Sequence, residues 1–221
     1  MTRVSALVVA AGAGKRFGRM KQFEALRGRP VVDWALEAFQ GHREVDDIVL
    51  VLPDERDGDP YRSRFGKVVG IVRGGERRQD SVRQGFRALD GSKTGLVLVH
   101  DGARPLVGPA LISRVIAAAR ADGAAVPGVP LEDTIKEVRD GRVARTVDRG
   151  NLFRIQTPQG FLYGLLRDAL ETARRDGFDG TDEAMLVERL GALVTRVEGD
   201  SRNIKITTPF DIKIAEALLD A

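Results

Sequence analysis

A cluster of glycines and cations lies near the N-terminus, at Gly12, Gly14, Lys15, Arg16 and Gly18. Glycines let backbone N–H groups approach an anion closely, and lysine and arginine add charge-assisted hydrogen bonds. An apolar segment directly precedes the cluster, and open α/β sheets bind ligands where their strands end. The segment therefore predicts a phosphate-binding loop, and the competing interpretation is a tight strand-to-helix turn without a ligand.

The spacing of the glycines distinguishes this loop from two familiar phosphate sites. The run reads G-x-G-x-x-x-G rather than the G-x-G-x-x-G of dinucleotide sites, and no Gly-Lys-Ser/Thr sequence follows as in a P-loop. Asp54 comes too late for the acidic residue expected roughly 20 residues after a dinucleotide loop. Lys21 adds a third cation to Lys15 and Arg16, and three cations on one short loop favour a polyphosphate.

A carboxylate follows another apolar segment. Asp101 comes directly after residues 96–99 and His100, so it is expected at the same sheet edge as the glycine loop. Mg²⁺ is commonly held by one or two carboxylates together with substrate phosphates and water. Asp101 is therefore the candidate metal ligand, although Asp-Gly is also a turn signal and a helix-capping or turn role is the alternative.

A second pair of glycines, Gly74 and Gly75, follows the apolar residues 68–72. Without side chains, these residues would let the backbone approach a flat base from the side. Ser81 lies close behind them and is a candidate hydrogen-bond partner for that base. The competing interpretation makes Ser81 an ordinary residue at a helix start.

Hydrophobic patterning indicates the elements that must position these groups. Apolar, β-branched segments typical of buried strands occur at residues 4–10, 48–52, 68–72, 96–99 and 124–129. Segments with helical periodicity alternate with them, at residues 31–39, 81–89 and 111–119. This alternation predicts an α/β fold with a mostly parallel open sheet, flanked by helices and connected by right-handed crossovers.

One stretch interrupts the alternation. Asp140-Gly141 lies between residues 134–138 and 142–147, which is a strong hairpin signal, and we expect a protruding β-arm at about residues 132–150. Two strands alone are marginally stable, so the arm is predicted to pack on a second subunit. Further elements are expected after the arm: a strand at 154–157, helices at 163–174 and 182–190, a strand at 193–197 and a helix after Pro209.

Composition narrows the class of protein. The sequence has 221 residues, no cysteine, 43% hydrophobic residues and a net charge of only +3. Aromatic residues make up 5% and no basic stripe interleaves with them, which argues against a nucleic-acid partner. The N-terminal apolar run is too short to span a membrane. With no linker or repeat, we expect one cytoplasmic domain over residues 1–221 with no membrane partner.

Six further segments occur in a characteristic order: Gly74-Gly75-Glu76-Arg77-Arg78-Gln79-Asp80-Ser81-Val82, His100-Asp101-Gly102-Ala103-Arg104-Pro105, Asp133-Thr134-Ile135-Lys136, Gln156-Thr157-Pro158-Gln159, Thr181-Asp182-Glu183 and Asn203-Ile204-Lys205. Together with the loop they resemble the 2-C-methyl-D-erythritol 4-phosphate cytidylyltransferases of the non-mevalonate isoprenoid pathway. The resemblance covers nearly the whole chain, although the stretch between Arg16 and Lys21 is shorter than is usual in that family. It implies a Rossmann-like nucleotidyltransferase fold.

The resemblance also implies a reaction, in which a phosphate oxygen of methylerythritol phosphate attacks the α-phosphorus of CTP and expels pyrophosphate, with Mg²⁺ as cofactor. A phosphate monoester has a second pKa near ~6, so the nucleophile is mostly ionised at neutral pH and needs no general base. Catalysis should then consist of positioning and cationic stabilisation, with Arg16 and Lys21 as the candidate catalytic residues.

The resemblance assigns the remaining site residues. Nucleotide binding falls to Ala10, Ala11, Gly12, Gly14, Arg16, Lys21, Gly74, Gly75, Glu76, Ser81, Asp101 and Gly102. Acceptor binding falls to Arg104, Thr134, Arg149, Thr157 and Lys205. Family members form homodimers in which arm residues complete the partner's site. Two alternatives stay open: a cytidylyltransferase for ribitol 5-phosphate or a related sugar phosphate, and a nucleotide-sensing module without turnover.

Overall fold

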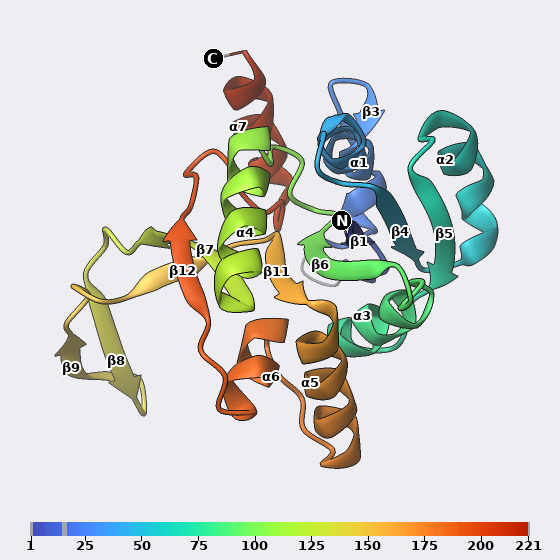
Figure 1. Cartoon of the computed structure of the whole chain (residues 1–221). Helices are drawn as coiled ribbons and strands as arrows, with labels where there is room; N and C mark the ends of the chain where they lie inside the picture. The colour runs from blue at the N-terminus through green and yellow to red at the C-terminus, as the bar shows by residue number, and fades with distance from the viewer. Residues whose placement is uncertain (1, 15–16, 221) are drawn as a thin grey trace.

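A twisted central sheet organises the molecule (Figure 1). The computed structural model describes residues 2–14 and 17–220. Within them an 8-stranded sheet has the order β10-β7-β11-β6-β1-β4-β5, with β12 also paired to β7. Its first strands are mutually parallel and have the bounds β1 (Arg3–Val9), β4 (Asp47–Leu52), β5 (Val68–Arg73) and β6 (Thr94–Asp101). The mostly parallel sheet expected from the alternation of strands and helices is confirmed.

The remaining strands make the other side of the sheet mixed. Their bounds are β7 (Ala124–Pro130), β10 (Phe153–Ile155), β11 (Gln159–Leu162) and β12 (Thr195–Glu198). β11 was not predicted, and it lies antiparallel between β6 and β7. Its Gly160 lies so close to α4 that a Cβ there would stand 2.8 Å from Val115 and 3.0 Å from Ala119. β11 has the sequence QGFL and runs directly into α5 (Tyr163–Arg175), so no separate run of apolar residues marks it as a strand.

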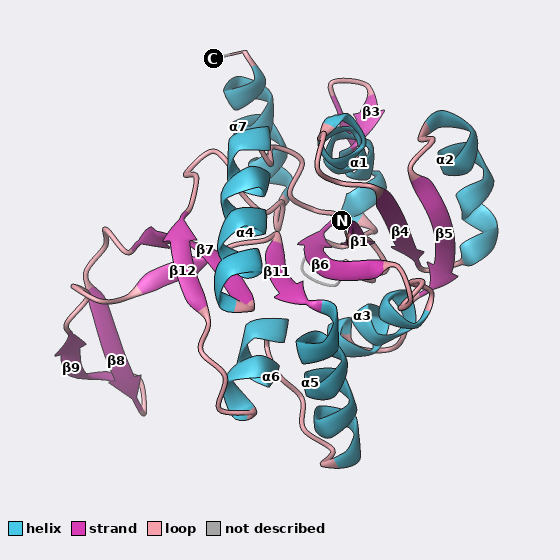
Figure 2. Cartoon of the chain, viewed as in Figure 1, coloured by secondary structure: helices cyan, strands magenta, loops and turns pink. Residues whose placement is uncertain are grey.

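Helices cover both faces of the sheet (Figure 2). On one face lie α1 (Val31–Gly41), α2 (Asp59–Arg64) and α4 (Pro109–Asp122), and on the other α3 (Arg78–Arg87), α5 (Tyr163–Arg175) and α6 (Glu183–Arg189). Successive residues of β1 point to opposite faces, so Ala6 and Val8 pack with the first group of helices and Leu7 with the second. Burial on both faces is why these strands read as continuous apolar runs.

A third, smaller core joins the C-terminal helix to the segment that follows the glycine loop. α7 (Pro209–Leu219) packs near two short strands, β2 (Ala25–Leu26) and β3 (Arg29–Pro30), and buries Leu26, Val31 and Ala215 together with Phe17. The short 3₁₀ helices η1 (Lys21–Phe23) and η2 (Glu55–Gly58), like α2, were too brief to predict. None of the described helices combines the length and the apolar character that a membrane crossing needs.

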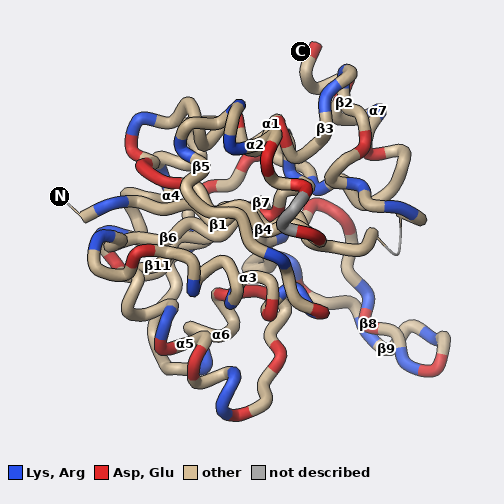
Figure 3. Tube along the Cα trace, turned by 90° about the vertical axis from the view of Figure 1, so that its right-hand side faces the viewer, with Lys and Arg blue, Asp and Glu red and all other residues tan. Residues whose placement is uncertain are grey.

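The hairpin arm projects from the body as predicted. It consists of β8 (Ile135–Arg139) and β9 (Arg142–Val147), joined at Asp140 and Gly141, whose φ angles of 49° and 73° suit a tight hairpin turn. Charges of both signs lie along it (Figure 3), and Glu137 pairs with Arg139 and Arg145. Val138 and Val143 are 56% and 62% exposed, so the arm buries little apolar surface of its own.

Candidate active site

A cavity of about 450 Å³ opens at the carboxyl ends of β1 and β6. Parallel strands end at one edge, and loops from several of them converge there. Most of the described residues predicted to bind nucleotide line this cavity: Ala10, Ala11, Gly12, Gly14, Lys21, Gly75, Glu76, Ser81 and Asp101. One predicted acceptor residue, Lys205, also lines it. The predicted phosphate loop therefore lies beside the predicted metal ligand.

The glycine loop is shaped by its own backbone. Gly14 has a φ of 64°, and a Cβ at this position would overlap the carbonyl group of Arg19, so only glycine is accommodated. Its carbonyl oxygen accepts hydrogen bonds from the N–H groups of Phe17 at 2.8 Å and Gly18 at 2.9 Å. Gln22 Nε2 donates to the Gly12 carbonyl at 3.0 Å, which ties η1 and its Lys21 to the loop. Lys15 and Arg16 lie outside the described residues.

The second glycine pair packs against the first loop. A Cβ at Gly74 would overlap the side chain of Ala11 and stand 2.8 Å from Ser81 Oγ. Ser81 Oγ accepts the N–H of Gly75 at 3.1 Å and lies 3.1 Å from the Arg77 carbonyl, to which it can donate. The Ser81 side chain therefore braces the glycine pair from within α3 and is more than an ordinary residue at a helix start.

A similar close approach occurs at the end of β6. A Cβ at Gly102 would stand 3.0 Å from the Cβ of Ala10, and the Gly102 N–H donates to the Val9 carbonyl at 2.9 Å. This packing holds Asp101 at the cavity wall, beside the end of β1.

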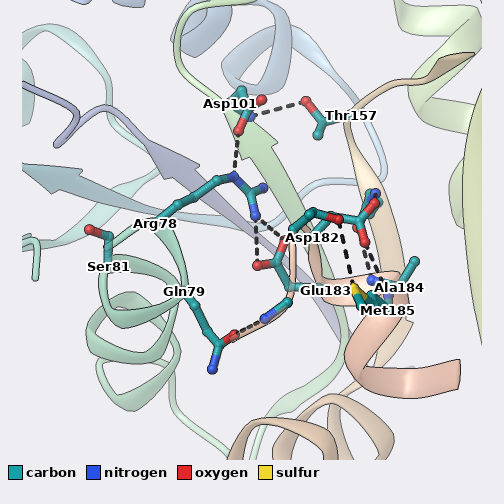
Figure 4. Close-up of polar contacts among 12 residues, drawn as sticks. Arg78, Gln79, Ser81, Asp101, Thr157, Asp182, Glu183, Ala184 and Met185 are labelled. Atoms are coloured by element: carbon teal, nitrogen blue, oxygen red, sulfur yellow. Dashed lines mark hydrogen bonds and ion pairs between the residues drawn. The ribbon is translucent and has the colours of Figure 1, made fainter. Parts of the chain in front are cut away.

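Asp101 is held by cations from two distant segments. Its Oδ1 accepts a hydrogen bond from Arg78 Nε at 2.9 Å, and its Oδ2 accepts one from Lys205 Nζ at 2.6 Å (Figure 4 shows the contact with Arg78). Burial opposes ionisation of the carboxyl, but Arg78 and Lys205 outweigh burial and hold the pKa of Asp101 well below its usual range. The carboxylate is therefore charged at neutral pH.

The donor set around Asp101 fits a magnesium ion that arrives with phosphates. Among the described residues, no group of three or more His, Cys, Asp or Glu side chains forms a complete metal cage. Each oxygen of Asp101 accepts one hydrogen bond and retains acceptor capacity, and the residue lines the cavity. One carboxylate with phosphate and water oxygens is a usual coordination sphere for Mg²⁺.

Thr157 and His100 brace the backbone of Asp101. Thr157 Oγ1 accepts the N–H of Asp101 at 3.0 Å and lies 3.1 Å from His100 Nδ1. The other ring nitrogen, Nε2, is 3.1 Å from the carbonyl oxygen of Arg104 and must donate to it. Burial lowers the pKa of His100 to about 4, so the ring is neutral at pH 7 and Nδ1 accepts the Thr157 hydroxyl proton.

Arg104 lies next to this group. Its Nη1 donates to the Asn203 carbonyl at 2.8 Å, and Asn203 Nδ2 donates to the Thr157 carbonyl at 2.8 Å. The Nε of Arg104 is buried without a hydrogen-bond partner among the described residues. Of the predicted acceptor residues near Asp101, Lys205 lines the cavity, whereas Arg104 and Thr157 do not.

Thr134 and Arg149 are not brought to the cavity within one chain. Both lie on the arm, where they line a separate surface hollow, and the Arg149 guanidinium donates to the Glu132 carbonyl. Figure 1 shows the arm at the far side of β7 from β1. Their predicted role in acceptor binding would need the cavity of another subunit.

Two charged residues at the site had no predicted role in the chemistry. Arg78 lines the cavity, and its Nη1 donates to both oxygens of Glu183, at 2.8 and 2.9 Å. Glu183 lies at the start of the helix predicted at 182–190, and it is 1% exposed. Both residues belong to segments that carried the family resemblance, and this was the available signal.

Known proteins resemble this chain over nearly its whole length. The model of the family described as 2-C-methyl-D-erythritol 4-phosphate cytidylyltransferase matches residues 4–221. The relative of that name from Syntrophotalea carbinolica is 46% identical over 226 residues, covering 98% of this chain and 96% of the relative. The relative from Geotalea uraniireducens is 47% identical over 225 residues, covering 98% and 97%.

Solved structures agree in fold. The crystal structure of 2-C-methyl-D-erythritol 4-phosphate cytidylyltransferase from Thermus thermophilus has a TM-score of 0.84 and 38% identity, with 100% of both chains covered. The 4-diphosphocytidyl-2C-methyl-D-erythritol synthase structure from Anaerococcus prevotii has a TM-score of 0.85 and 33% identity, covering 100% of this chain and 99% of the other.

Proposed function

The chain belongs to the 2-C-methyl-D-erythritol 4-phosphate cytidylyltransferase family, and from that premise we propose how its residues perform the reaction. The enzyme transfers CMP from CTP to 2-C-methyl-D-erythritol 4-phosphate, giving 4-diphosphocytidyl-2-C-methyl-D-erythritol and pyrophosphate. The observation that carries the proposal is the cavity in which the glycine loop, Lys21, Asp101 and Lys205 meet.

The chemical step joins an acceptor phosphate oxygen to the α-phosphorus of CTP and breaks the bond from that phosphorus to the pyrophosphate oxygen. Both partners are anions, so positioned cations are the main requirement. Lys21 lines the cavity beside the loop, and we assign it with Arg16 to the α-phosphate. Asp101 would hold Mg²⁺, which would neutralise charge on the phosphates when bound.

The nucleotide and the acceptor occupy different sides of the cavity in this proposal. The glycine pair at Gly74 and Gly75, braced by Ser81, would receive the cytosine through backbone contacts. On the other side, Lys205 lines the cavity and is suited to the acceptor phosphate. Arg104 lies behind the cavity lining, and its buried Nε would reach the acceptor phosphate only after its side chain turns. Thr157 shapes that side through the Asp101 backbone.

The arm would complete the site of a second subunit. The arm leaves Val138 and Val143 exposed and buries little apolar surface of its own, which favours packing on another copy of the chain. Thr134 and Arg149 would then reach the partner's acceptor side. We propose a homodimer built through the arm and acting in the cytoplasm, because both substrates are highly charged phosphate esters.

Pyrophosphate release tests the proposal. Each nucleoside triphosphate is offered with Mg²⁺, first with methylerythritol phosphate and then with ribitol 5-phosphate as acceptor. We expect turnover with CTP and methylerythritol phosphate only. Comparable turnover with ribitol 5-phosphate would retain the chemistry and change the acceptor, and nucleotide binding without any turnover would support a sensing module instead.

A further inference from the structure

Four charged side chains form one connected group at the cavity, and three of them line it. Arg78 contacts Asp101 at 2.9 Å and Glu183 at 2.8 Å, and Lys205 contacts Asp101 at 2.6 Å. They come from the start of α3, the end of β6, the start of α6 and the segment before α7. With both carboxyls ionised, two positive and two negative charges balance within the group. Burial raises the pKa of Glu183, and its contact with Arg78 opposes that shift and favours the ionised form.

Glu183 is the one member of this group to which the proposed reaction gives no role. Its side chain is 1% exposed, against 11% for Asp101, 27% for Arg78 and 35% for Lys205. It does not line the cavity, so it reaches the substrates only through Arg78. Burying a carboxylate is costly unless the charge is paired, and here both oxygens of Glu183 accept from Arg78 Nη1.

The backbone around Glu183 is tied to the site by hydrogen bonds (Figure 4). Asp182 caps α6 by accepting the Met185 N–H at 3.0 Å, and Gln159 donates to Asp182 at 2.7 Å. On the other side, Gln79 of α3 accepts the Gly180 N–H at 2.9 Å. The start of α6 is therefore anchored both to β11 and to α3, and Glu183 stands at a defined place.

We propose that Glu183 is a positioning residue that, through Arg78, keeps the Asp101 carboxylate available to the divalent cation of the CTP complex. This inference rests on the proposed function and deepens it. Arg78 gives Asp101 a single hydrogen bond through Nε, and the contact of its Nη1 with Glu183 restrains the orientation of the guanidinium. An unrestrained guanidinium pairs with a carboxylate through two parallel hydrogen bonds, which would take up more of its acceptor capacity.

The charge balance leads to the same expectation. Without the negative charge of Glu183, Arg78 and Lys205 leave an excess positive charge beside Asp101. That excess repels a divalent cation but attracts a triphosphate. Loss of Glu183 should therefore weaken cation binding selectively, whereas a purely structural role would weaken the cation and the nucleotide together.

The test compares Glu183→Gln with Glu188→Gln, an exposed residue of the same helix. Calorimetry on the full-length protein measures two dissociation constants: that of a non-hydrolysable CTP analogue without metal, and that of Mg²⁺ for the protein saturated with the analogue. For Glu183→Gln we expect the Mg²⁺ constant to rise roughly 10- to 100-fold, as is typical when a residue supporting a metal ligand is lost. The metal-free analogue should bind as tightly as before or more tightly, and Glu188→Gln should match the wild type.

An unchanged Mg²⁺ constant in folded Glu183→Gln protein would overturn the proposal, as would an equal weakening of analogue and Mg²⁺. If that variant does not fold, Glu183→Asp, which keeps the charge but shortens the reach to Arg78, serves the same comparison and should give a smaller rise. Wild-type turnover separates the two proposals. A wild type inactive with CTP and methylerythritol phosphate refutes the proposed function, whereas an active wild type with an unaltered variant refutes only the role of Glu183.

Discussion

The Asp101 carboxylate combines a buried position with two cationic partners and an open side toward the cavity. This combination explains why its pKa is held low even though burial opposes ionisation. A charge maintained in this way, at the edge where the phosphate loop ends, is suited to a metal-bound triphosphate.

Replacing Asp101 by asparagine tests that role. The substitution keeps the shape but removes the negative charge, so we expect kcat to fall by on the order of 100-fold or more, as for other preorganised charge contacts. Pyrophosphate release measured across a Mg²⁺ titration checks this. Turnover and Mg²⁺ dependence near those of the wild type, in folded protein, would refute the assignment.

The hydroxyl of Thr157 is the basis of a second prediction, because it donates a hydrogen bond to His100 Nδ1 and accepts one from the Asp101 N–H. A committed hydroxyl positions the backbone of Asp101 and does not donate to the acceptor phosphate. Thr157→Val should therefore lower kcat by roughly tenfold, the loss of about one buried hydrogen bond, with little change in the KM for methylerythritol phosphate. Steady-state kinetics decide the matter.

The matched control for that substitution is Thr157→Ser, which retains the hydroxyl and should stay close to wild type. If Thr157→Val instead raised the acceptor KM and left kcat intact, the hydroxyl would be a direct substrate contact.

Among the elements, β11 and the arm show two ways in which a short segment serves the site. β11 inserts antiparallel between β6 and β7, and this brings Thr157, just before it, next to the Asp101 backbone. The arm instead carries Thr134 and Arg149 away from their own chain's cavity. One element completes the site within the chain, and in the proposed dimer the other would complete the site of a second copy.

Arg149→Ala tests the contribution of the arm to acceptor binding. Loss of a charged hydrogen bond, worth about 1.5–3 kcal/mol, should raise the KM for methylerythritol phosphate roughly 10- to 100-fold and leave CTP binding nearly unchanged. Kinetics with each substrate varied in turn provide the comparison, and equal effects on both substrates would argue against an acceptor role.

Mixing Arg149→Ala protein with Lys21→Ala protein tests whether the arm acts across a dimer. In a heterodimer with exchanged arms, one site combines the intact Lys21 of one subunit with the intact Arg149 of the other. Activity should then appear in the mixture although each variant alone is impaired. Isolated heterodimers that stay inactive would show that the arm does not complete the partner's site.

For the whole molecule, the burial of His100 couples stability to pH. Its pKa is about 4 in the folded protein and 6.5 in a model compound, and burial is the main cause of the difference. Between these values the unfolded chain binds more protons than the folded one, so the free energy of unfolding falls as the pH decreases from 6.5 towards 4. The full contribution of this group is about 3 kcal/mol and is present above that window.

His100→Gln should remove this part of the pH dependence, because glutamine can still donate to the Arg104 carbonyl but does not titrate. Chemical denaturation at several pH values measures the slope. His42, whose pKa burial also lowers, provides the control, and His42→Gln should retain the His100 component. Equal slopes for wild type and His100→Gln would contradict the prediction.

The sequence by itself determined the parallel half of the sheet, the helices beside it and the hairpin of the arm. Each has a local physical cause: strands buried on both faces must be continuously apolar, helices with one buried face show their period, and Asp140-Gly141 favours one turn. The glycine loop and Asp101 were also accessible, because both follow directly on apolar strands that end at one edge.

Only the tertiary structure decided the placement of β11 and the charged group of Arg78, Asp101, Glu183 and Lys205. β11 contains Gly160 and runs directly into α5 without a separate apolar run, and its position depends on a gap between two other strands. The burial of Glu183 depends on Arg78, which is 105 positions away in the sequence. The local sequence around a carboxylate at a helix start predicts an exposed residue. Whether a guanidinium from another helix pairs with that carboxylate depends on the tertiary packing, which no local pattern encodes.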